Sequence, residues 1–64
     1  MDKVLEVLLK QVRERRDQLI LAVSQSAAKD FSEYQKLCGV IQGLEFAKLC
    51  IEDLAKRLEI DADE

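Results

Sequence analysis

Three arginines lie within four positions in the first half of the chain: Arg13, Arg15 and Arg16. A guanidinium group binds carboxylates and phosphates through two parallel hydrogen bonds, so this cluster could hold phosphate, a small anionic ligand or an acidic protein surface. Glu14 and Asp17 are interleaved with the arginines, and opposite charges three or four residues apart also stabilise an exposed helix. The cluster therefore predicts either a partner-binding patch or a salt-bridged face, solvated or between subunits.

Two glycines, Gly39 and Gly43, stand four residues apart inside an otherwise helix-forming stretch. Each costs about 0.8–1 kcal/mol relative to Ala in a helix interior. Because residues four apart share a helix face, the pair opens a notch that another backbone or a bulky side chain can approach closely. With Phe46 and Cys50 the glycines form a row that we predict to be a subunit contact. A close crossing with the first helix and relief of crowding around aromatic side chains are the alternatives.

The remaining residue types argue against catalysis. The chain has no histidine, which removes the usual general base and most metal-site arrangements. Cys38 and Cys50 are separated by about 18 Å along a helix, so they cannot bridge within it, and we expect reduced thiols. The carboxylates at 59–64 lack the shielded setting that acid–base catalysis requires. We expect no enzyme activity, no metal and no cofactor.

Composition and spacing predict an all-α chain of 64 residues without proline. Apolar residues recur at helical spacing over about residues 2–27 and again over 31–59. In the second stretch seven of them alternate three and four apart, a row typical of coiled-coil packing: Leu37, Val40, Leu44, Ala47, Ile51, Leu54 and Leu58. Asp30 followed by Glu33 predicts an N-cap with its acidic partner, which places a turn at about 27–30 and leaves an acidic tail at 60–64.

The two stretches are similar in length, so we expect them to lie antiparallel as one hairpin domain over 1–64. A single continuous helix is the alternative, because neither Gly nor Pro marks the turn. The second helix carries more apolar surface than one neighbour can cover, which predicts a homodimeric four-helix bundle or a higher helical oligomer. Through Lys29 six basic residues face four acidic ones, and from Asp30 onward four face nine, so the two halves attract each other.

Two segments resemble a group of small, uncharacterised proteins of tailed, especially short-tailed, bacteriophages: Arg15-Arg16-x-x-Leu19 and Ala28-Lys29-Asp30-Phe31-x-Glu33-Tyr34-x-x-Leu37-x-Gly39-x-Ile41-x-Gly43-Leu44. The resemblance implies a phage-encoded helical protein, a minor virion or assembly component. It transfers no binding residue. A dimerising helical hairpin is also similar, in architecture alone, to the plasmid-copy-control RNA-binding protein Rop.

We therefore expect a non-enzymatic structural or protein-interaction component whose partners are copies of itself, phage virion proteins or a host protein. One alternative is a nucleic-acid- or nucleotide-binding oligomer that uses the arginine face, and another is an inhibitor of a host enzyme. The net charge of −3 and the absence of aromatic residues among the arginines weigh against nucleic acid. No apolar run approaches the roughly 20 residues that cross a bilayer, and no signal peptide is visible. The expected location is the host cytoplasm or the virion.

Overall fold

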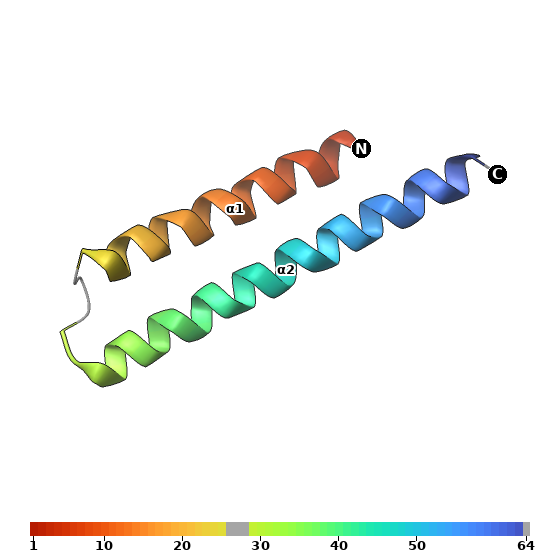
Figure 1. Cartoon of the computed structure of the whole chain (residues 1–64). Helices are drawn as coiled ribbons and strands as arrows, with labels where there is room; N and C mark the ends of the chain where they lie inside the picture. Colours follow the sequence, from red (N-terminus) through yellow and green to blue (C-terminus); the bar gives the residue numbers. More distant parts are fainter. Residues whose placement is uncertain (26–28, 64) are drawn as a thin grey trace.

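The computed structural model describes residues 1–25 and 29–63, and within these ranges the side chains up to residue 59. The described chain is helical and contains no strand, with α1 at Lys3–Ser24 and α2 at Phe31–Asp63. The helices run antiparallel and pack against each other, so that both ends of the chain lie at the same end of the hairpin (Figure 1). The predicted all-α hairpin of two helices is confirmed, and the alternative of one continuous helix is wrong.

The first helix begins at a side-chain cap. The carboxylate of Asp2 accepts hydrogen bonds from the backbone N–H groups of Val4, at 2.9 Å, and Leu5, at 3.2 Å. Two of the donors that every helix start leaves without a partner are satisfied in this way. The helix therefore starts at Lys3, one residue later than the spacing predicts, and it ends at Ser24, three residues earlier than predicted.

Asp30 caps α2, as its spacing from Glu33 predicts. The Oδ1 atom of Asp30 accepts from the Glu33 backbone N–H at 2.8 Å, and Oε2 of Glu33 accepts from the Lys29 backbone N–H at 3.0 Å. The reciprocal bond therefore goes to the residue before the cap and ties the incoming chain to the first turn of the helix. Lys29 and Asp30 lie outside both helices, as the predicted turn requires, whereas 27 and 28 lie outside the described residues.

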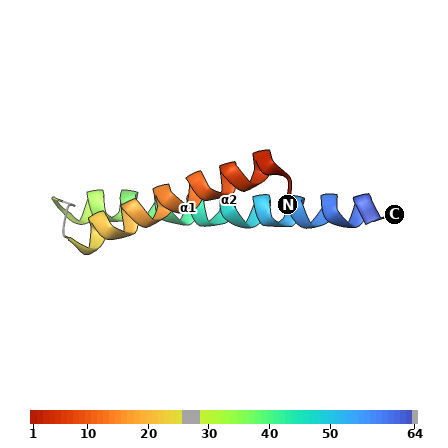
Figure 2. The same ribbon diagram turned by 90° about the horizontal axis from the view of Figure 1, so that it is seen from above.

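The second helix is longer than the first, 33 residues against 22, and extends past the start of α1 (Figure 2). Its backbone stays helical to Asp63, whereas the sequence predicts that the helix ends at about residue 59 and is followed by an acidic tail. The Met1 ammonium group lies 3.3 Å from Oε1 of Glu59 and joins the two helices at this end. The resulting rod measures 52 × 15 × 13 Å, with a radius of gyration of 15.1 Å. A compact chain of this length is expected to have about 11 Å.

The core of the hairpin is small. Among the described residues the buried side chains are Leu9, Leu19, Ile51 and Ala55. Two helices share one narrow strip of contact, which cannot cover every apolar side chain that they carry. The chain exposes 5116 Å², whereas a compact protein of 7.3 kDa is expected to expose about 4,200 Å².

The coiled-coil row predicted on α2 is turned to one side of the contact with α1. Ile51 is buried and Leu44 is half-buried, but Val40, Leu54 and Leu58 each keep 45% of their surface exposed. The first helix thus covers one edge of the row and leaves the other edge open.

Candidate functional site

The contact between the helices follows a row on each helix that alternates four and three residues, which we call the seam. The seam positions of α1 are Leu5, Leu9, Val12, Arg16, Leu19 and Val23. Those of α2 are Leu37, Ile41, Leu44, Lys48, Ile51 and Ala55. All twelve side chains are buried or half-buried. Near the middle, each helix therefore places one cation, Arg16 or Lys48, inside an otherwise apolar strip.

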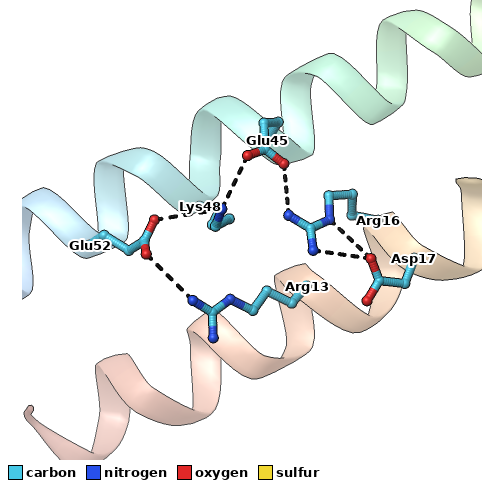
Figure 3. A network of polar contacts seen from close by, with 6 residues as sticks. All are labelled: Arg13, Arg16, Asp17, Glu45, Lys48 and Glu52. Carbon is cyan, nitrogen blue, oxygen red and sulfur yellow. Dashed lines mark hydrogen bonds and ion pairs between the residues drawn. The ribbon is translucent and has the colours of Figure 1, made fainter.

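Arg16 forms the shortest polar contact between the helices. Its Nη1 atom lies 2.8 Å from Oε2 of Glu45 on α2, and its Nε and Nη2 atoms each lie 3.1 Å from Oδ1 of Asp17 (Figure 3). Only 20% of the Arg16 side chain is exposed. Three nitrogen atoms of the guanidinium group thus contact two carboxylates of the same chain.

Lys48 and Arg13 extend the contact into a network. The Lys48 Nζ atom lies 3.2 Å from Oε1 of Glu45 and 3.9 Å from Oε1 of Glu52. The other oxygen of Glu52, Oε2, lies 3.4 Å from Nη2 of Arg13 on α1. These contacts run without a break from α1 to α2 and back, and we call them the ion network (Figure 3).

The ion network favours the charged forms of Arg16 and Glu45. The hydrogen bond from Arg16, followed by that from Lys48, holds the pKa of Glu45 below its ordinary value. The same bond to Glu45, followed by that to Asp17, raises the pKa of Arg16. Glu45 is therefore ionised throughout the neutral range. Its charge is matched by two cations, so the network is an internal, compensated cluster.

This arrangement is suited to setting the register of the hairpin. A seam that were apolar throughout would allow α2 to slide or rotate against α1 at small cost. Arg16 removes that freedom, because a shift by one turn would take this half-buried cation away from Glu45 on the facing helix. The contacts of the cluster are those that a structural role requires, since both carboxylate oxygens of Glu45 already accept from a cation.

The three predicted partner-binding arginines have different surroundings. Arg13 and Arg16 reach across the hairpin to Glu52 and Glu45, whereas Nη1 of Arg15 lies 3.4 Å from Oε1 of Gln18 on its own helix. Salt bridges are present, but Arg13 and Arg16 pair with the other helix of the same chain, which is neither the exposed single-helix pairing nor the pairing between subunits that the sequence predicts. Arg15 remains exposed and outside the ion network.

The four predicted interface residues on α2 point away from α1. Gly39, Gly43 and Cys50 are exposed, and Phe46 keeps 70% of its surface exposed. No described atom outside the local backbone lies within 4 Å of the point that a Cβ would occupy at either glycine. The alternatives of a close crossing with the first helix and of relief from aromatic crowding are therefore wrong. The subunit contact stays a prediction.

Outside the ion network, the described side chains form one aromatic pair and no second cluster of charged or metal-ligating groups. Phe31 and Tyr34 stack with ring centroids 6.3 Å apart, and a hydrogen bond with Cys38 raises the pKa of Tyr34. Neither cysteine is bridged; Cys38 is half-buried and Cys50 is exposed. Over the described residues, no group of three metal-ligating side chains converges. In the same part of the chain, neither helix has a stretch long and apolar enough to cross a membrane.

The chain matches no family model, no curated protein and no solved structure. The resemblance to small phage proteins therefore stays a prediction. The candidate site rests on geometry alone.

Sequence reasoning missed the ion network because the charged stretch around Arg16 interrupts the apolar pattern of α1. The signal was nevertheless present. Counting in fours and threes from Leu9 through Val12 reaches Arg16 and then Leu19, so this arginine occupies a seam position. The same count on α2 passes through Lys48.

Proposed function

We propose that this chain is a non-enzymatic structural or protein-interaction component that works as a helical oligomer. The observation that carries the proposal is a set of large apolar side chains that remain 42–74% exposed, among them Val4, Leu8, Val40, Leu54 and Leu58, whereas four of the described side chains are buried. Single exposed apolar residues are ordinary, but an extended set marks an interaction surface.

The accessible surface supports the same proposal. The exposed 5116 Å² exceeds the expectation for a compact monomer of this mass by about 900 Å². Chains of this size gain little stability from a single core and commonly rely on association, metals or disulfides. Its two cysteines are unbridged and no metal cluster is found among the described residues, which leaves association as the support that fits best.

A nucleic-acid-binding oligomer has less support. Phosphate would have to displace Glu45 and Glu52 to reach Arg16 and Arg13, which leaves Arg15 as the accessible arginine of the cluster. This alternative predicts retention on immobilised RNA that falls steeply with added salt and is lost in Arg15→Gln. The role of host-enzyme inhibitor has no feature of the described surface in its favour.

The proposed place of this oligomer is a phage particle or its assembly, and this part rests on the sequence resemblance alone. Its test is a pull-down with tagged protein from lysates of infected and uninfected cells. Capture of virion proteins would support the role, whereas capture of a host enzyme from uninfected cells would favour the inhibitor.

The oligomer itself is tested by sedimentation equilibrium of the full chain from micromolar to millimolar concentration, with helicity followed by circular dichroism. We expect a mass of at least two chains of 7.3 kDa while the protein is helical. A fully helical species with the mass of one chain at the highest concentration would refute the proposal.

A further inference from the structure

The seam divides the surface of the hairpin into two sides. Arg13 follows the seam residue Val12, and Glu52 follows the seam residue Ile51, and these two charged side chains meet at 3.4 Å. Residues that follow a seam position therefore lie on the same side of both helices, which we call the network side. Because each residue advances about 100° around an α-helix, residues that precede a seam position lie on the opposite side, which we call the open side.

The two sides differ in chemistry. Seven of the twelve positions that follow the seam are charged, against two of the twelve that precede it, and neither of those two is acidic. The open side instead presents Val4 and Leu8 from α1 and Val40, Ala47 and Leu54 from α2. This apolar face draws on both helices and is interrupted by Gln11, Arg15 and Gln18 on α1 and by Lys36 at the start of α2.

The predicted coiled-coil row of α2 lies between the seam and this open side. It shares Leu37, Leu44 and Ile51 with the seam, whereas Val40, Ala47 and Leu54 precede seam positions. The same spacing on α1 gives Leu5, Leu8, Val12, Arg15, Leu19 and Ala22. The apolar row of each helix thus faces midway between the other helix of the hairpin and the open side. This direction suits a helix that packs against two neighbours, as each helix does in a four-helix bundle.

We infer that a second copy of this chain covers the open side, so that the coiled-coil rows of four helices form the core of an antiparallel bundle. This inference rests on the proposed self-association and identifies the surface through which the two copies associate. The excess exposed surface, about 900 Å², is close to the roughly 800 Å² per partner that a stable interface of standard size buries. The open side includes Gly43 and Cys50 from the predicted row, but Gly39 and Phe46 point outward, away from this face.

Charge indicates how the second copy is oriented. α1 carries five basic and three acidic residues, whereas α2 carries four basic and seven acidic ones. A twofold axis along the bundle places α1 of one chain over α2 of the other, so that each helix touches only helices of opposite net charge. The other antiparallel arrangement places like helices in contact and is disfavoured by their repulsion.

Arg15 is the one charged residue near the middle of the open side. The small residues of α2 on the same side leave space for its side chain. Ala47 and Gly43 leave room for the aliphatic stem to cross the face and carry the guanidinium out to water. A polar residue at such a position specifies the arrangement at a cost in stability. Replacement by Leu should therefore tighten the dimer.

The inference is tested by two matched leucines on α2. Leu54 precedes a seam position and is 45% exposed, whereas Leu49 follows one and is 55% exposed. Sedimentation equilibrium should show the dimer of Leu54→Glu weakened by about a hundredfold or more, because each chain would bury a carboxylate in place of a leucine. The Leu49→Glu dimer should stay within about twofold of wild type, because its substitution faces water.

Because Leu54→Glu could weaken the dimer simply by unfolding the chain, a second pair of variants tests for stronger association. Arg15→Leu should strengthen the dimer about tenfold or more, whereas Arg13→Leu, on the network side, should not strengthen it. Dissociation by Leu49→Glu with no effect of Leu54→Glu would overturn the choice of face while the chain still associates. A helical wild-type monomer at millimolar concentration would instead overturn the proposed function itself.

Discussion

Replacing each glycine of α2 by alanine tests whether the helix surface at that position is exposed to solvent or contacts a second copy of the chain. Gly39 and Gly43 both lie in the helix interior, and a Cβ added at either meets nothing within 4 Å apart from the adjacent residues and the local helix backbone. In the isolated hairpin each substitution should therefore stabilise the folded state by about 0.8–1 kcal/mol, the difference in helix propensity between Gly and Ala. For a domain of this size that gain raises the melting temperature by roughly 4–8 °C.

The two positions should differ once the chain associates. Gly39 faces outward, so Gly39→Ala should keep its full gain at every protein concentration. Gly43 lies on the open side, where an added methyl group would meet the second copy, so Gly43→Ala should gain less at concentrations that favour the dimer. Thermal unfolding followed by circular dichroism at low and high concentration measures both effects.

Two results would contradict this reasoning. A loss of stability in Gly39→Ala would mean that another element approaches the outer surface of α2. An equal gain from both variants at high concentration would mean that no second copy approaches Gly43.

Two further predictions concern charge and covalent capture. Because the pKa of Glu45 is lowered in the folded state, its pairing with Arg16 stabilises the fold above the carboxyl pKa of the unfolded chain. This contribution is lost as the pH falls through the pKa of the folded state. Urea denaturation should therefore show that wild type loses more stability than Glu45→Gln on acidification below about pH 4.5. Oxidation should not join two Cys50 residues efficiently, because the proposed twofold axis places them on diagonal helices beyond the roughly 7 Å limit between Cα atoms; a fast Cys50–Cys50 disulfide, identified by peptide mass spectrometry, would show that like helices are adjacent.

Much of the fold could be predicted because it depends on local chemistry. Asp30 and Glu33 mark the start of α2 through hydrogen bonds that span three and four residues, and apolar spacing marks the helices on either side of the turn. The bounds of α1 were less accurate, since a carboxylate cap at Asp2 competes with helical propensity over a single residue.

The candidate site could be predicted only in part. An arginine cluster with interleaved acids indicates salt bridges, but Arg13 pairs with a residue 39 positions away and Arg16 with one 29 positions away. A long arginine side chain could pair with several of the carboxylates in the sequence. The arrangement of the two helices determines which carboxylate each arginine meets. The glycines show the same limit, because their spacing indicates a bare face without saying what that face meets.

The sequence by itself determined two helices, their capped turn and an apolar row too broad for one neighbour, because propensity and periodicity act within a few residues. Only the tertiary structure decided which edge of that row α1 covers. A row spaced three and four apart can rotate toward either flank with little change in buried area. Arg16 removes this ambiguity, because this half-buried cation stays in the seam only where Glu45 of the facing helix meets it.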